Sequence, residues 1–259
     1  MMPRVVETAE TADLQRRAAE IEREFLAGFG LRPEQLERYR RELAESGLVA
    51  HLEARAAEFW RTVEGRTVRG QRYNTGRITG RTGYDEGLRL YALVRELAPR
   101  AAVETGVCNG VSTAFLLAAL ERNRAGELHS IDLPEFAGRE YAPDAFWAGK
   151  GGAVVPDGKQ PGWMVPVQLR ARWRLHVGRS QELLPGLLAR LEPIDVFLHD
   201  SEHSYECMSF ELAAAFEALR PGGALVADDV DGNGAFHELA RRHGRAPIRI
   251  GPKMAALRK

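Results

Sequence analysis

From residue 84 to the end of the chain, short apolar runs alternate with longer segments whose apolar positions recur every three or four residues. The short runs have the length and composition of buried strands, and the longer segments have the period of helices. Strands that alternate with helices form a mostly parallel sheet with helices on both faces. We therefore predict an open α/β sheet. Its expected strands are 101–105, 128–132, 173–177, 194–199 and 224–227, with a closing hairpin over 247–257.

Residues 1–62 show helical periodicity only. Leu14, Ala18, Ile21 and Phe25 recur at helical spacing, and charged residues occupy the other positions. We predict an N-terminal helical extension that acts as a cap or as an oligomerisation arm. A homo-oligomer that forms through these helices is therefore one expected assembly.

Two further segments have the composition of loops. Residues 63–83 are rich in arginine and glycine, which is typical of a solvated linker or of a lid whose arginines bind a carboxylate. Residues 133–172 form an insertion after the second strand, rich in proline and glycine. This insertion starts at the carboxyl end of a strand, the ligand side of an open α/β sheet. We expect its Trp147 and Trp163 to close over a substrate, within a catalytic domain that spans 84–259.

Composition narrows the class of protein. The 259 residues include 36 Lys and Arg and 36 Asp and Glu. The chain therefore lacks the excess of basic residues that is typical of a nucleic-acid-binding protein. The two cysteines, Cys108 and Cys207, form no CxxC pair, and we interpret Cys108 as a packing residue. The polar start of the chain does not resemble a signal peptide, and no apolar run reaches the roughly 18 residues that cross a bilayer. We expect a cytoplasmic protein that acts on a small molecule and binds neither membrane nor nucleic acid.

Candidate binding residues follow the first predicted strand. Glu104 and Thr105 lead into Gly106, and Gly110 comes four residues later. This spacing is not the GxGxxG of dinucleotide sites, and no Lys-Ser/Thr follows as in a phosphate loop. Glycines still allow a ligand to approach the backbone closely. A ligand with cationic groups needs a nearby carboxylate, which Glu104 supplies.

The second and third strands add two candidates. Asp132 ends the second strand, 22 residues after Gly110, where an acid can accept hydrogen bonds from ribose hydroxyls. It could instead cap a following helix, and a nicotinamide dinucleotide would also suit this acid. Ser180, after the third strand, is expected either at the adenine edge or as a helix N-cap.

Carboxylates gather after the fourth and fifth strands. Asp200 follows the fourth, and Asp228 and Asp229 follow the fifth. Adjacent parallel strands bring such residues together, and the carboxylates then repel one another unless a cation neutralises them. An all-oxygen set suits Mg²⁺, although Asp228 or Asp229 could simply cap a turn. His203 lies three residues after Asp200 and is a natural general base near neutral pH.

These motifs resemble class I S-adenosylmethionine (SAM)-dependent methyltransferases. Glu104-Thr105-Gly106 through Gly110 is similar to their first motif, Asp132 to their ribose-binding acid, and 219–223 to their L-x-P-G-G turn before strand five. The resemblance implies a Rossmann-like sheet of seven strands in the order 3-2-1-4-5-7-6. It also implies SAM as the cofactor, bound by Glu104, Thr105, Gly106, Gly110, Asp132, Ser180 and Asp200.

Within that class, Asp200, Asp228-Asp229 and His203 resemble the metal sites of cation-dependent O-methyltransferases of the catechol and macrolide-sugar types. This implies methyl transfer to a hydroxyl of a small polar molecule, such as a sugar or secondary metabolite. Mg²⁺ would be held by the three aspartates, with Asp200 and His203 as catalytic residues. The alternatives are a metal-independent N- or C-methyltransferase, an NAD-dependent oxidoreductase, and a binding protein without catalysis.

Overall fold

One seven-stranded sheet organises the computed structural model, which describes residues 9–63, 67–68, 71–72, 81–137, 139–148 and 154–259. The strand order is β5-β4-β3-β6-β7-β9-β8, which confirms the order predicted from the resemblance. The strands are β3 (Ala101–Thr105), β4 (Glu127–Asp132), β5 (Trp173–Val177), β6 (Ile194–His199), β7 (Leu219–Ala227), β8 (Ile248–Arg249) and β9 (Ala255–Arg258). The five strands from β5 to β7 are parallel, and β9 runs antiparallel to both β7 and β8.

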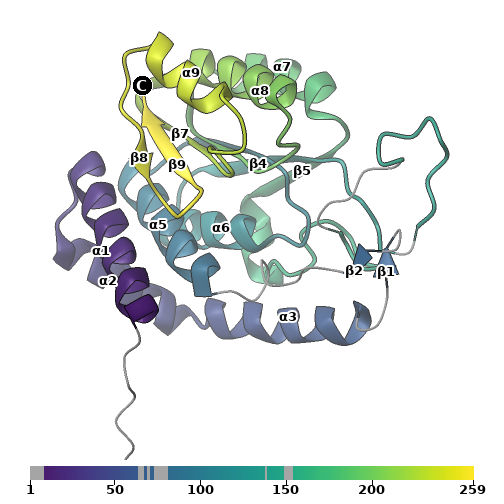
Figure 1. Cartoon of the computed structure of the whole chain (residues 1–259), viewed down its shortest axis with the longest axis horizontal. Helices are drawn as coiled ribbons and strands as arrows, with labels where there is room; N and C mark the ends of the chain where they lie inside the picture. Colours follow the sequence, from purple (N-terminus) through teal and green to yellow (C-terminus); the bar gives the residue numbers. More distant parts are fainter. Residues whose placement is uncertain (1–8, 64–66, 69–70, 73–80, 138, 149–153) are drawn as a thin grey trace, which may run out of the picture.

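Helices cover both faces of this sheet (Figure 1). One face packs against α7 (Ser180–Leu191), α8 (Tyr205–Ala218) and α9 (Ala235–Arg242), and the other against α5 (Arg81–Leu97) and α6 (Val111–Asn123). Two apolar clusters fill these layers and meet at the strands. All six residues of β6 are buried, as expected for a central strand with helices on both faces.

The strand register decides which residues meet at the carboxyl edge of the sheet. Thr105 at the end of β3 pairs with Ile131 of β4 and with His199 of β6, and His199 pairs with Ala227 of β7. The residues that come next along each strand are therefore neighbours. They are Gly106, Asp132, Asp200 and Asp228.

The start of the fifth parallel strand differs from the prediction. Strand β7 begins at Leu219, so the predicted L-x-P-G-G turn lies within the strand, where the pairing with β6 is irregular between Ile194 and Val196. Gly222 there has a φ of 80°, a conformation that other residues rarely adopt. In the closing hairpin, β9 lies between β7 and β8, as the predicted strand order requires.

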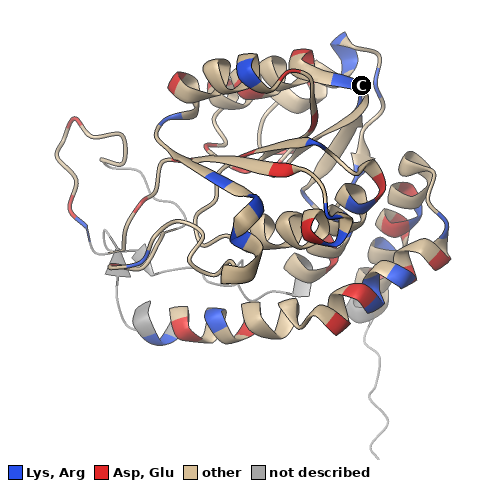
Figure 2. Ribbon diagram, turned by 180° about the vertical axis from the view of Figure 1, so that it is seen from behind, with Lys and Arg blue, Asp and Glu red and all other residues tan. Residues whose placement is uncertain are grey.

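The N-terminal helices pack onto the sheet domain. They are α1 (Ala9–Phe29), α2 (Pro33–Ser46) and α3 (Leu48–Val63). Phe25, Leu43 and Phe59 are fully buried in the same apolar cluster as α5 and α6. Figure 2 shows acidic and basic residues interspersed along these helices. The extension thus forms part of the domain's core, and assembly through it remains a prediction.

The arginine- and glycine-rich segment 63–83 lies mostly outside the described residues. Its described part includes a short antiparallel pairing of β1 (Thr67–Val68) with β2 (Gln71–Arg72), and α5 already begins at Arg81. The interpretation of this segment as a linker or lid stays a prediction. Among the helices that the structure describes, none combines the length and the apolar character of a membrane span.

Candidate active site

A cavity of about 570 Å³ opens at the carboxyl edge of the sheet, beside the tips of β3, β4, β5 and β6. It is bounded by strand tips, the insertion and the start of two helices. Its lining includes four carboxylates and one guanidinium, and so carries net negative charge. The lining residues are Gly106, Cys108, 131–135, Phe146, Trp147, 178–181, 200–203 and Cys207.

Asp132 lies at the wall of this cavity and is buried. Its Oδ1 accepts hydrogen bonds from the backbone N–H groups of Val107 (2.9 Å) and Cys108 (3.4 Å). Its Oδ2 has no hydrogen-bond partner among the described residues. Burial raises the pKa of Asp132, and the two N–H groups oppose that rise. No helix starts in the described residues directly after Asp132, so the N-cap alternative is wrong, and Asp132 keeps one buried oxygen without a hydrogen-bond partner at the wall of the cavity.

Glu104 does not line the cavity. Its side chain is fully buried and accepts hydrogen bonds from Ser112 (2.7 Å), Thr113 (2.8 Å) and Ser130 (2.8 Å). Burial raises its pKa to about 7, against the lowering effect of the three hydroxyls. The sequence places Glu104 correctly next to the glycine loop. In this structure, however, its carboxyl group ties β3 to α6 and β4.

Of the other residues predicted to bind the cofactor at or after the end of β3, Gly106 lines the cavity, whereas Thr105 and Gly110 do not. Gly106 lines the cavity with a φ of 85°, and a Cβ there would lie 1.9 Å from the carbonyl oxygen of Asp200. Thr105 is buried and donates to Glu211 instead of facing the cavity. A Cβ on Gly110 would lie 2.7 Å from the Cα of Gly162, so this glycine admits the insertion, not a ligand.

Ser180 lines the cavity and is the first residue of α7, whereas the N-cap position belongs to Arg179.

The two tryptophans of the insertion differ in their surroundings. Trp147 lines the cavity and donates to the carbonyl oxygen of Leu133 (3.1 Å). Trp163 is not among the lining residues, because it packs inward and donates to Asn109 (2.7 Å).

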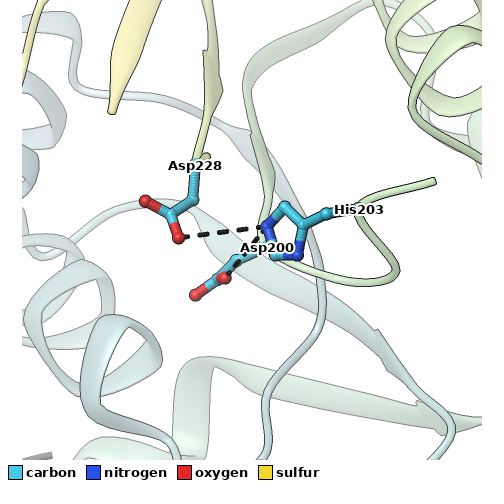
Figure 3. Close-up of side chains that lie close together, drawn as sticks. All are labelled: Asp200, His203 and Asp228. Carbon is cyan, nitrogen blue, oxygen red and sulfur yellow. Dashed lines mark ion pairs between the residues drawn. The ribbon is translucent and has the colours of Figure 1, made fainter. Parts of the chain in front are cut away.

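Figure 3 shows the side chains of Asp200, His203 and Asp228 converging, and Asp200 and His203 also line the cavity. The Nε2 atom of His203 lies 3.8 Å from Oδ1 of Asp200 and 3.9 Å from Oδ2 of Asp228. One ligand atom from each of the three residues lies within 4.8 Å of the others. Two carboxylates and one imidazole at this spacing fit a hard or borderline divalent cation such as Mg²⁺ or Mn²⁺.

The third predicted ligand, Asp229, is not part of this cluster. Its Oδ1 atom lies 3.3 Å from Nζ of Lys253, and its backbone is left-handed with a φ of 48°. This left-handed turn directs the Asp229 side chain toward Lys253, whereas Asp228 faces His203. The third member of the cluster is His203, which the sequence had indicated as a general base and not as a metal ligand.

One residue of the site environment, Glu86, was missed in the sequence, and one, Cys108, was interpreted only as a packing residue. Burial and then the charge of Asp228 raise the pKa of Glu86, on α5, to about 7. Cys108 lines the cavity, and burial raises its pKa well above the ordinary thiol value, which disfavours the reactive thiolate form. Glu86 lies too far from the strand tips in sequence for spacing to reveal it.

A family model described as a methyltransferase domain matches residues 103–230. Residues 103–230 are a methyltransferase domain. The matched residues run from β3 to just beyond the tip of β7, and so include every candidate side chain except Glu86. The match confirms the recognition made from the sequence motifs, and the alternative of an NAD-dependent oxidoreductase is wrong.

Solved structures of other methyltransferases are similar to this chain at low identity. An O-methyltransferase from Bacillus cereus in complex with SAH is 15% identical, with 83% of this chain and 91% of that chain covered and a TM-score of 0.46. The O-methyltransferase TomG from Streptomyces achromogenes, in complex with SAM, is 18% identical, with 80% and 89% covered and a TM-score of 0.47. No curated protein matches the sequence. Because these TM-scores are below 0.5, the assignment of the methyltransferase domain rests on the family model.

Proposed function

We propose that this methyltransferase domain transfers the methyl group of SAM to a hydroxyl of a small polar acceptor, such as a sugar or secondary metabolite. A divalent cation, Mg²⁺ or Mn²⁺, assists the transfer. The observation that carries the proposal is the position of the Asp200, His203 and Asp228 cluster at the edge of a cavity that also contains Asp132.

The cavity suits SAM better than a dinucleotide. Its net negative lining favours a ligand with a sulfonium and an ammonium group, and disfavours a pyrophosphate. Oδ2 of Asp132 is placed to accept a hydrogen bond from a ribose hydroxyl, and Ser180 and Trp147 border the space beside it for the base. SAM would therefore lie along the tips of β3, β4 and β5, with its sulfonium toward Asp200.

The cluster of Asp200, His203 and Asp228 would determine where the methyl acceptor binds. Asp200, His203 and Asp228 would hold the cation, and when bound this cation lowers the pKa of an acceptor hydroxyl while SAM supplies the methyl group. Asp200 lines the cofactor cavity and would also hold the cation, so it would align the two reactants. The insertion carries Trp147 over the same cavity and restricts water there.

A second candidate is methyl transfer without a metal, with His203 as the general base. The same distances support it, because two carboxylates next to one imidazole orient the ring and stabilise its protonated form. If Nε2 binds a cation, that nitrogen is not available to take a proton. The two proposals therefore exclude each other.

The test is a methyl-transfer screen with isotopically labelled SAM over hydroxylated sugars and metabolites, with added Mg²⁺ or with EDTA. We expect methylated product with Mg²⁺ and a strong decrease with EDTA. Activity that EDTA leaves unchanged would overturn the metal proposal in favour of His203 as the base. Absence of heat on titration of SAM into the protein would overturn the cofactor assignment itself.

A further inference from the structure

The three residues of the cluster share one neighbour, His199. Asp200 follows it directly in the chain, and the backbone N–H of Asp228 donates to the carbonyl oxygen of His199 (2.9 Å). The ring of His203 stands edge-on to the ring of His199, with centroids 5.3 Å apart. His199 is fully buried. His199 therefore adjoins all three members of the cluster, Asp200 and Asp228 through its backbone and His203 through its ring.

A buried carboxylate holds His199 in place. Nδ1 of His199 lies 2.6 Å from Oε2 of Glu211, and Glu211 is also fully buried, on the inner face of α8. Burying a carboxylate is costly unless its hydrogen bonds are satisfied. A charge kept at that cost in the interior indicates a task other than packing, which an apolar residue would fulfil better.

Glu211 also accepts hydrogen bonds from the loops that form the cavity. Oε2 accepts from Thr105 (2.5 Å), and Oε1 accepts from Ser201 (2.8 Å) and from the thiol of Cys207 (3.4 Å). Burial raises the pKa of Glu211, but the hydrogen bonds, led by that of His199, outweigh burial and leave it below the ordinary value. The carboxylate is thus ionised and joins the tips of β3 and β6 to α8.

We propose that Glu211 and His199 form a positioning pair that holds Asp200, His203 and Asp228 at the spacing that binds the divalent cation. This inference rests on the proposed metal site and adds two residues that do not themselves contact the cation. Residues behind metal ligands set ligand orientation, and their loss typically lowers metal affinity about 10- to 100-fold.

The central variant is Glu211→Gln in the full chain. Gln has nearly the same shape, but it carries no charge and one of the two accepting oxygens becomes an N–H₂ group that donates. The four hydrogen bonds that Glu211 accepts can then no longer all form as they do now. We expect the affinity for Mn²⁺, measured by calorimetry and by the electron paramagnetic resonance of the ion, to fall about 10- to 100-fold. SAM affinity is measured beside it to separate a local effect from loss of the cavity.

Asp195→Asn is the matched control, because Asp195 is another buried acid on the same strand, β6. It lies at the opposite end, where Oδ2 accepts from the backbone N–H groups of Arg100 (2.8 Å) and Ala101 (3.0 Å). We expect this variant to lose stability and to keep the Mn²⁺ affinity of the original protein. Equal loss of Mn²⁺ affinity in both variants would mean a general effect of destabilising β6, and would overturn the positioning role.

Variants of Thr105 keep the test valid if Glu211→Gln fails to fold. Thr105→Val removes one hydrogen bond to Glu211 without changing the size of the side chain, and Thr105→Ser retains the hydroxyl. We expect Val to weaken Mn²⁺ binding and Ser to restore it. A Val variant that binds Mn²⁺ as tightly as the original protein would count against the pair.

The outcomes separate this inference from the proposed function. If the unaltered protein binds no Mn²⁺, with or without SAM, the metal proposal fails and the positioning pair fails with it. If the unaltered protein binds Mn²⁺ and Glu211→Gln binds it equally well, only the positioning pair is overturned. A weakened Glu211→Gln beside an unchanged Asp195→Asn supports it.

Discussion

The backbone N–H of Asp228 donates to the carbonyl oxygen of His199 over 2.9 Å, which places Asp228 beside Asp200 across two neighbouring strand tips. The hydrogen bond continues the ladder of β6 and β7 by one step. Because both aspartates leave the sheet at the same level, their carboxylates reach the same imidazole, that of His203.

This relationship predicts the effect of removing either carboxylate. Asp200→Asn or Asp228→Asn should lower Mn²⁺ affinity at least about 100-fold, the upper end of what outer residues cost, because a ligand itself is lost. Calorimetric titration of Mn²⁺ checks this. Asp231→Asn is the control, since Asp231 is exposed and pairs with His237 outside the cluster. Unchanged Mn²⁺ binding in Asp228→Asn would contradict the assigned ligand set.

Asp132 predicts a specific effect on the cofactor. Asp132→Asn leaves one oxygen for the N–H groups of Val107 and Cys108 and replaces the unpartnered oxygen, the proposed ribose acceptor, with an N–H₂ group. A hydrogen bond to a charged group contributes about 1.5–3 kcal/mol, so SAM affinity should fall roughly 10- to 100-fold. Calorimetric titration of SAM measures the change. Asp144→Asn, an exposed acid of the insertion, should leave SAM affinity as it was.

A comparison of Gly106 with Gly30 separates two costs of replacing a glycine, namely backbone strain and steric overlap of the new side chain. Both have positive φ, 85° and 66°, but a Cβ on Gly106 would overlap the Asp200 carbonyl whereas one on Gly30 meets nothing within 4 Å. Gly30→Ala should cost about 1–2 kcal/mol from its left-handed backbone. Gly106→Ala should cost roughly 1–3 kcal/mol more through overlap. Urea unfolding of both variants tests this, and equal losses would mean that the strand tips can separate freely.

A histidine pair away from the site predicts a dependence of stability on pH. Nδ1 of His129 lies 3.3 Å from Nε2 of His176 on adjacent strands. Burial lowers both pKa values. His176 and Arg174 lower that of His129 further, against the charge of Glu127, and Arg190 lowers both. The folded state then binds these protons less readily than the unfolded chain, so stability present above the unfolded pKa of about 6.5 is lost as the pH falls through it.

The variant His176→Gln should show that loss less strongly. Its stability relative to the original protein should be higher at pH 5.5 than at pH 7.5, as measured by urea unfolding at each pH. His237→Gln, at an exposed position, should keep the original pH dependence. A constant difference between His176→Gln and the original protein at both pH values would rule out the pair as the cause.

Much of the site could be predicted because it lies where strands end. Asp132, Asp200 and Asp228 each follow a buried strand, and parallel strands in register bring such residues to one edge whatever their distance in the chain. The direction in which a side chain points after the end of a strand could not be predicted from the sequence. Asp228 turns to His203 and Asp229 turns to Lys253, and the hydrophobic pattern is the same for both.

The chain's own pattern of apolar and polar residues determined the α/β sheet, its helical extension and the edge at which chemistry takes place, because strand and helix periods are local properties. The tertiary structure alone decided that Glu104 points into the interior, that Trp163 packs while Trp147 lines the cavity, and that Glu211 lies behind His199. Each of these depends on which atoms of a distant segment face the side chain, and the burial and hydrogen bonds that result arise only when the layers pack together.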